Sequence, residues 1–195
     1  MTRTAVGITA FVVALLLLVV GGLALAGSRY ISGNVHDELA AQKIAFAPAG
    51  SPGLPADIQS YGGKAVTNGA DAKVFANQYI SAHIGESIAA AAKTDPRIKG
   101  MTTFSELSGL ARTDPKNQSL SGLVDSVFRG EMLRSSLLSA WGWDTMASIM
   151  YAAAFFAFGV AVLLIIAGAA LVPAVATRVG LSRLVPAKPV VPAPG

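Results

Sequence analysis

Two long stretches of the sequence contain almost no polar side chains. No charged residue occurs at residues 4–28 or at residues 145–177. An α-helix needs about 20 mainly apolar residues to cross the hydrocarbon core of a bilayer, and both stretches are long enough. The sequence therefore predicts transmembrane helices at residues 5–28 and 145–172, with residues 29–144 between them.

Between these stretches, apolar residues recur every three or four positions, which is the spacing of amphipathic helices. This spacing continues over residues 31–44, so the first helix is predicted to extend beyond the bilayer. Residues 48–69 are rich in Pro and Gly and predict a loop, with short extended pieces near Phe46 and near Ala65 and Val66.

A further helix is predicted to start directly after Asn68. Asn is a preferred N-cap residue, and Asp71 would lie in the first turn, where a negative charge is favourable. This helix is predicted to end at Asp95, which precedes a proline. Thr103 and Glu106 have the spacing of a capping box, so a short helix is predicted to start there.

The short helix is predicted to end near Arg112, and the last helix to begin near Ser119. The last helix leads into the second transmembrane segment, and Asp144 with Thr145 is predicted to cap that segment. Its apolar stripe consists of Leu120, Leu123, Val124, Val127, Met132, Leu137 and Leu138.

Charges indicate how the chain is oriented. All eleven carboxylates lie between the two predicted transmembrane helices and are balanced there by basic residues, so the net charge of +4 comes from the tails. Short basic segments stay in the cytoplasm, whereas long domains cross the membrane largely regardless of charge. Residues 1–4 and the basic, Pro-rich residues 173–195 are therefore predicted to be cytoplasmic, and residues 29–144 extracytoplasmic.

Composition agrees with a membrane protein. Of the 195 residues, 53% are hydrophobic and 13% are charged, which is too apolar for an ordinary soluble domain. Cysteine is absent, so no disulfide holds the outer domain. The predicted fold is an all-α integral protein of the plasma membrane, with two transmembrane helices that flank a mostly helical extracytoplasmic domain.

The first apolar stretch also has features of a cleavable signal peptide. Ala24, Leu25 and Ala26 resemble a signal peptidase site. However, the apolar core of a signal peptide is about 7 to 15 residues long, and the run at residues 5–26 is longer. We therefore expect residues 5–28 to be an uncleaved signal anchor.

Aromatic and small residues indicate which parts of the helices meet the membrane surface or a neighbour. Tyr30, Trp141 and Trp143 flank the apolar stretches and are predicted to anchor the chain at the membrane–water interface. Small residues four apart let helices approach closely. The predicted helix-packing residues are Gly22, Ala26, Ala153, Ala157 and Ala161, although an alanine-rich composition would produce the same pattern.

Candidate catalytic groups are few. His83 and Glu86 share a helical face, and with His36 they are the only candidate metal ligands. The alternative is that all three are solvated polar residues on amphipathic helices. The sequence has no nucleophile elbow, no phosphate-binding loop and no ionisable residue inside either predicted transmembrane helix. We expect no cofactor, no enzymatic activity and no nucleic-acid partner.

Three stretches resemble a known family. VTNGADAKVFANQYISAHI, GMTTFSELS and FRGEMLRSSLLSAWGWDTM are similar to small actinobacterial membrane proteins of unknown function, which pair two transmembrane helices with an outer segment of similar helices. The similarity covers roughly residues 5–172. Members are often labelled aromatic ring-opening dioxygenases, but such an enzyme needs an iron site, commonly two His and a carboxylate. His36 and His83 are the only histidines, so the resemblance implies no activity.

Three functions remain open at this point. The favoured hypothesis is a non-enzymatic accessory or assembly subunit of a membrane or cell-envelope complex, with other membrane protein subunits and the lipid bilayer as partners. Arg129, Glu131 and Arg134 would then dock a partner or, alternatively, form ion pairs on a solvated helix face. The second hypothesis is a module that binds envelope lipids, and the third is a metal-dependent enzyme.

The predicted topology can be tested with single cysteines, because the chain has none of its own. One is introduced at Asn117 and one at Ala187. A membrane-impermeant thiol reagent added to whole cells should label the first and not the second. If only the tail cysteine is labelled, the chain has the opposite orientation to the one predicted.

Overall fold

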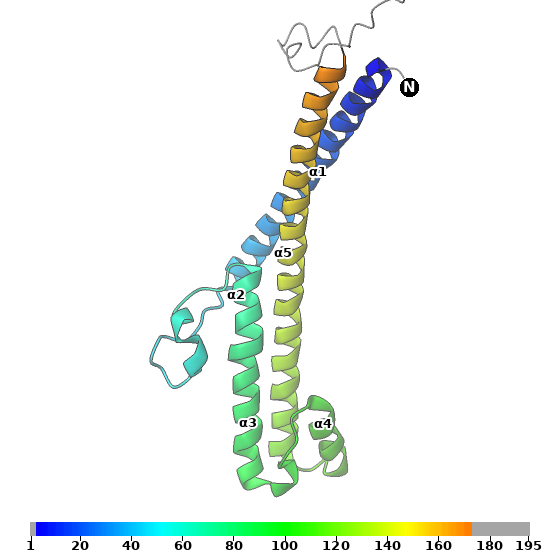
Figure 1. Ribbon diagram of the computed structural model, residues 1–195. Helices are drawn as coiled ribbons and strands as arrows, with labels where there is room; N and C mark the ends of the chain where they lie inside the picture. Colours follow the sequence, from blue (N-terminus) through cyan, green and yellow to red (C-terminus); the bar gives the residue numbers. More distant parts are fainter. Residues whose placement is uncertain (1–2, 173–195) are drawn as a thin grey trace, which may run out of the picture. The chain divides into compact units, whose positions relative to one another are not determined.

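The structure is a computed structural model that describes residues 3–172, which are almost entirely helical (Figure 1). No strand occurs among these residues, and Ala45 and Ala65 form one isolated antiparallel bridge. The elements are α1 (Arg3–Gln42), the 3₁₀ helix η1 (Ala56–Tyr61), α2 (Gly69–Val74), the π-helical segment η2 (Phe75–Ile80), α3 (Ser81–Thr94), the 3₁₀ turn η3 (Pro96–Ile98), α4 (Phe104–Thr113) and α5 (Gln118–Leu171).

The described chain divides into two compact units. The apolar unit comprises residues 3–28 of α1 and residues 148–172, which are mostly α5. The central unit comprises residues 29–147 and contains all the shorter elements. The predicted extracytoplasmic domain thus corresponds closely to one unit, although its side of the membrane remains a prediction.

Both long helices run without a break. α1 continues to Gln42, which confirms the predicted helical extension beyond the first apolar stretch. α5 continues from Gln118 to Leu171. The prediction that Asp144 and Thr145 cap a separate second span was therefore wrong. Thr145 lies inside the helix, and its hydroxyl donates to the carbonyl of Trp141 (2.8 Å).

In the apolar unit, α1 and α5 pack antiparallel through small residues. A Cβ atom on Gly7 would lie 3.1 Å from the carbonyl oxygen of Gly168, and one on Gly21 would lie 3.3 Å from that of Ala154. Glycine is therefore needed where the backbones come closest. The buried small residues recur every seven positions, at Gly7, Ala14 and Gly21 in α1 and at Ala154, Ala161 and Gly168 in α5.

This seven-residue row differs from the packing residues that were predicted from four-residue spacings. Gly22, Ala26 and Ala153 are exposed within the described chain, and Ala157 is half-buried. Of the predicted set, only Ala161 is fully buried. The prediction was wrong for the contact between α1 and α5, because a helix pair that keeps one seam in contact needs a repeat of seven residues.

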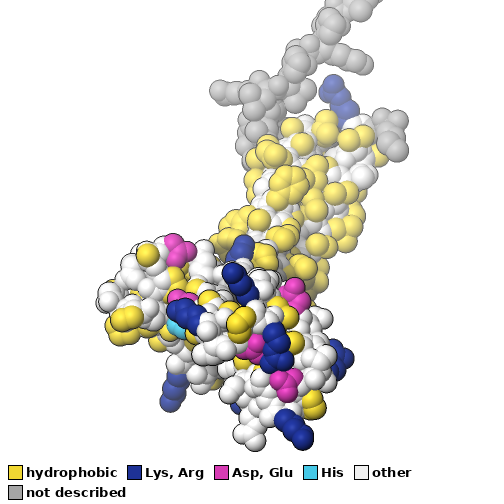
Figure 2. All heavy atoms as spheres, turned by 90° about the horizontal axis from the view of Figure 1, so that it is seen from below, with side chains coloured by type: hydrophobic (Ala, Val, Ile, Leu, Met, Phe, Trp, Pro, Cys, Tyr) yellow, Lys and Arg dark blue, Asp and Glu magenta, His cyan; other side chains and the backbone are white. Residues whose placement is uncertain are grey.

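The remaining surface of the apolar unit is hydrophobic (Figure 2). Both long helices are long and apolar enough to cross a membrane. Core helices of soluble proteins are mostly buried, whereas only 11% of the apolar window in α1 and 22% of that in α5 are buried within the structure. This exposed apolar surface favours a membrane environment for the unit.

The central unit has two hydrophobic clusters. The first surrounds Phe46, whose ring contacts those of Tyr61, Phe75 and Tyr79 at centroid distances of 4.9 to 5.9 Å. This cluster holds the loop after α1 against η2. The second lies where α3, η3, α4 and α5 meet, and its buried members are Ile88, Ile98, Leu107, Leu120 and Val127.

The predicted caps are present. The Asn68 side chain accepts a hydrogen bond from the main-chain N–H of Asp71 (2.9 Å). Thr103 and Glu106 form a complete capping box at the start of α4. There, hydrogen bonds from the N–H of Thr102 and from Thr103 hold the pKa of Glu106 below its usual value. These caps confirm the predicted helix starts.

Asn117 also caps a helix. Its side-chain oxygen accepts from the main-chain N–H of Leu120 (3.0 Å), near the start of α5. Replacing Asn117 would remove this hydrogen bond. Lys116 is exposed and is therefore the less disruptive position for the outer cysteine of the labelling test.

Asp144 joins three segments of the central unit. Its carboxylate accepts hydrogen bonds from the main-chain N–H of Gly69, at the start of α2 (3.1 Å), and from the hydroxyl of Ser32 in α1 (3.2 Å). A carboxylate at the positive end of a helix is favourable and satisfies a donor that the helix itself leaves unpaired. Asp144 therefore acts as a cap, but for α2 and not for its own helix.

Replacing Asp144 with Ala tests this junction. The N–H of Gly69 and the hydroxyl of Ser32 would each lose a partner, so the free energy of unfolding should fall by about 1–3 kcal/mol. Thermal unfolding of the full-length protein in one detergent, followed by far-UV circular dichroism, measures the effect. Asp125→Ala is the matched control, because Asp125 forms only an exposed ion pair with Arg129 and should change little. Equal effects of the two changes would contradict a special role for Asp144.

Replacing Ala154 with Leu tests the seven-residue row. Ala154 is 0% exposed, and overpacking such a site should destabilise the helix pair by about 1–3 kcal/mol. Ala153→Leu makes the same chemical change at an exposed neighbouring position and should be tolerated. The midpoint temperatures of both variants in detergent decide the matter. If Ala153→Leu lowers the midpoint temperature more than Ala154→Leu does, the packing face contains Ala153 and the seven-residue row is wrong.

Candidate functional site

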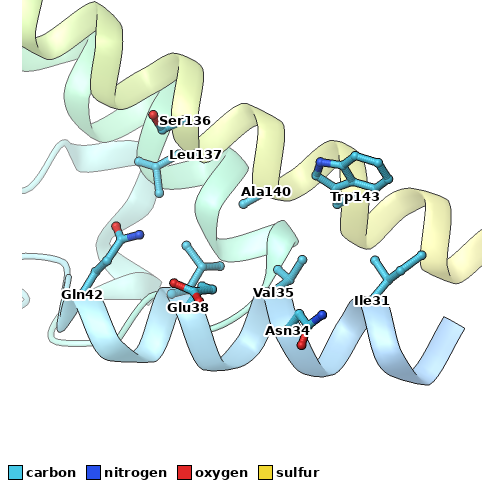
Figure 3. Close-up of a pocket in the computed structure, with 10 residues that line it drawn as sticks. Ile31, Asn34, Val35, Glu38, Gln42, Ser136, Leu137, Ala140 and Trp143 are labelled. Atoms are coloured by element: carbon cyan, nitrogen blue, oxygen red, sulfur yellow. The ribbon is translucent and has the colours of Figure 1, made fainter. Parts of the chain in front are cut away.

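A groove in the central unit lies between α1 and α5 and encloses about 330 Å³ (Figure 3). Its floor is apolar: Ile31 and Val35 project from α1 toward α5, and Leu137 projects from α5 toward α1. The remaining lining residues are Asn34, Glu38, Leu39 and Gln42 of α1 and Ser136, Ala140 and Trp143 of α5. The volume is within the range of pockets that hold small organic ligands.

The helical repeat explains the division between the floor and the rim of the groove. Ile31, Val35 and Leu39 follow one another at four-residue spacing, so they share one face of α1. Asn34, Glu38 and Gln42 repeat the same spacing, each three positions after one of these apolar residues, and form an exposed polar edge beside that face. The groove therefore matches an amphiphilic ligand, because it combines buried apolar surface with hydrogen-bonding groups along one side.

The lining of the groove contains little chemistry for catalysis. Glu38 is its only ionisable residue. General acid–base or nucleophilic catalysis needs a second group within hydrogen-bond reach of the first, and the other polar lining residues are two amides and a hydroxyl. The arrangement can bind and orient a molecule through apolar contact and a few hydrogen bonds.

The predicted metal candidates are placed apart from this groove. The His36 Nδ1 atom lies 3.0 Å from the carbonyl oxygen of Thr67, and the His83 Nδ1 atom lies 2.8 Å from that of Tyr79. Glu86 is exposed. Among residues 3–172, no group of three or more His, Cys, Asp and Glu side chains comes together in a way that could hold a metal ion.

The three predicted interface aromatics have different surroundings. Tyr30 and Trp143 are 72% and 58% exposed, and their contact with a membrane surface stays a prediction. Trp141 is half-buried, and the Lys73 ammonium lies 4.1 Å from the centroid of its ring. Trp141 therefore makes a cation–π contact within the central unit, which the sequence did not indicate.

Arg134 contacts the neighbouring helix, which the sequence did not indicate. Its guanidinium donates to the carbonyl of Ala76 (3.1 Å) and to the Asn77 side chain (3.3 Å), and it pairs with Glu131 at 2.9 Å. Ala76 lies in the π-helical segment η2, where the regular hydrogen bonds of an α-helix are interrupted. Arg134 therefore supplies a hydrogen bond to a carbonyl of this segment. It therefore packs between helices and does not belong to a solvated face.

A second surface in the central unit is an exposed aromatic patch, which we define as Phe104, Phe128 and Met132. The rings of Phe104 in α4 and Phe128 in α5 are 5.4 Å apart. Met132 follows Phe128 by one helical turn and is exposed. The sequence analysis included Met132 in the apolar stripe of α5, but the structure leaves Met132 exposed, and Arg134 faces the neighbouring helix instead.

Comparisons with protein-family models, with curated proteins and with solved structures gave no match to this chain. The resemblance to small actinobacterial membrane proteins therefore stays a resemblance. What this protein does must be inferred from its two units, its groove and its aromatic patch.

Proposed function

We propose that this protein is a non-enzymatic accessory or assembly subunit of a larger membrane or cell-envelope complex. In this proposal the apolar unit lies in the plasma membrane, the central unit lies outside, and both termini are cytoplasmic. The observation that carries the proposal is the aromatic patch of Phe104, Phe128 and Met132, which the described residues 3–172 leave exposed.

The patch has the composition of a protein-binding surface. Phe and Met are enriched in the buried centres of protein interfaces, whereas most exposed surfaces of soluble units avoid large apolar side chains in contact with one another. An ion pair between Arg129 and Asp125 lies beside the patch on α5. Such a polar edge around an apolar centre is the usual arrangement of an interface.

The apolar unit is consistent with the same role. Its two helices use one seam of small residues to pack against each other, and Gly22, Ala26 and Ala153 are left on exposed surface. These positions are available to lipid or to the helix of another membrane subunit. No Asp, Glu, Lys, Arg or His lies in the described apolar segments beyond Arg3 at the start of α1, so neither transport nor proton transfer is proposed.

A lipid-binding role is the second candidate function, and the groove between α1 and α5 is the observation that favours it. A metal-dependent enzyme has no such support, because His36, His83 and Glu86 do not come together with a further ligand among the described residues. No nucleic-acid partner is proposed.

The accessory-subunit proposal is tested by Phe128→Gln in the full-length protein. Interface hot spots in apolar centres commonly contribute about 2 kcal/mol or more, so recovery of a stoichiometric partner after mild-detergent purification should fall several-fold. The membrane level and helical content of the variant should not change, since Phe128 is 46% exposed.

Leu133→Gln is the matched control for this change. Leu133 is 39% exposed and lies about 140° around α5 from Phe128, outside the patch. Its substitution should leave partner recovery intact. If both variants retain the partner equally, or if no stoichiometric partner co-purifies with the unchanged protein, the proposal is wrong.

A further inference from the structure

The rim of the groove between α1 and α5 carries one carboxylate between two carboxamides. Asn34, Glu38 and Gln42 lie at four-residue spacing, so they stand about 6 Å apart along the same side of α1. All three are exposed. The rim therefore offers, in order, an amide, a negative charge and a second amide, beside a floor that contains only apolar side chains.

The negative charge of this rim has no partner within the described chain. The ion pairs among residues 3–172 do not include Glu38. A ligand that fits the groove should accordingly place a positive charge beside Glu38. It should also carry groups that accept hydrogen bonds from the amide N–H₂ groups on either side. An anionic ligand without a cationic group would be repelled.

We propose that the groove binds a phosphatidylethanolamine-type lipid. Its ammonium group pairs with Glu38, and its phosphate accepts hydrogen bonds from the amide of Asn34 or Gln42. The two-carbon link of ethanolamine keeps the two charges close enough to meet neighbouring residues of the rim. One acyl chain lies on the floor formed by Val35, Leu39 and Leu137.

The position of the groove favours a lipid over a protein helix as the occupant. One end of the groove is formed by Ile31 and Trp143. Trp143 is largely exposed and lies in the same unbroken helix that continues into the apolar unit. When that unit lies in a bilayer, lipid is the amphiphile present at the highest local concentration beside Trp143. A protein helix remains an outcome that the test can identify.

Trp143 supplies a probe within the groove. The chain has two tryptophans, and Trp141→Phe leaves Trp143 as the only one while keeping an aromatic ring beside Lys73. The full-length variant is purified in a neutral detergent and titrated with phosphatidylethanolamine that carries bromine on its acyl chains, which quenches nearby tryptophan fluorescence. Quenching should saturate at about one lipid per protein and should be reversed by unbrominated phosphatidylethanolamine.

Headgroup recognition is tested with matched lipids and variants. Brominated phosphatidylcholine, whose ammonium has no hydrogen-bond donor, and brominated phosphatidylglycerol, which is anionic, should need at least about tenfold more lipid for half-saturation. Glu38→Gln should weaken the binding of phosphatidylethanolamine by a similar factor. Asp37→Asn removes a charge at an exposed neighbouring position outside the groove and should have no such effect.

The acyl-chain site is tested by filling it. Ala140→Leu enlarges a side chain that lines the groove and should abolish saturable quenching. Ser139→Leu changes an exposed residue that does not line the groove and should preserve quenching. Circular dichroism shows whether both variants keep their helical content.

Two results would overturn the proposal. The first is equal quenching by all three lipids that neither Glu38→Gln nor Ala140→Leu changes. The second is a Trp143 that stays unquenched at saturating lipid, which would exclude a lipid and leave a protein helix as the alternative occupant. Either failure is distinct from failure of the accessory-subunit proposal, because that proposal depends on Phe128 and partner recovery.

Discussion

Three segments of the central unit depend on the carboxylate of Asp144. It caps the start of α2 through the N–H of Gly69 and binds Ser32 of α1, while it is itself part of α5. Gly69 is needed at this point, because a Cβ atom there would lie 2.9 Å from Cα of Trp141. The same contact places Ile31 of α1 near Trp143 of α5, at one end of the groove.

The two candidate surfaces of the central unit have different physical origins. The groove exists because α1 and α5 each bring an apolar stripe, yet Ala140 is too small to fill the space between them. The aromatic patch exists because α4 covers only one side of α5, which leaves Phe104 and Phe128 in contact with each other and with solvent. A lipid in the groove and a protein at the patch could be bound together, because the groove and the patch share no residue.

Much of the fold could be predicted from local sequence. The caps at Asn68 and Thr103 were identified correctly because capping depends on residues within three positions of each other. The site was harder to predict. The helical spacing of apolar residues over residues 31–44 was recognised, but nothing local shows that this face lines an open groove. Met132 was counted in the apolar stripe of α5, yet it is exposed, whereas Arg134 packs against the neighbouring helix because it binds the carbonyl of Ala76.

The sequence by itself determined the two apolar helices, the helical nature of the region between them and the starts of the shorter helices. These features follow from hydrophobic length, periodicity and capping, which are properties of neighbouring residues. Only the tertiary structure decided which face of each long helix is buried, because that choice depends on the partner across the contact. Gly21 lies in the seam, because a Cβ atom on Gly21 would meet Phe158 of α5, whereas a Cβ atom on Gly22 would meet nothing within 4 Å. Asp144 likewise caps α2 and not its own helix, because Gly69, 75 residues away in the chain, is brought to its carboxylate by folding.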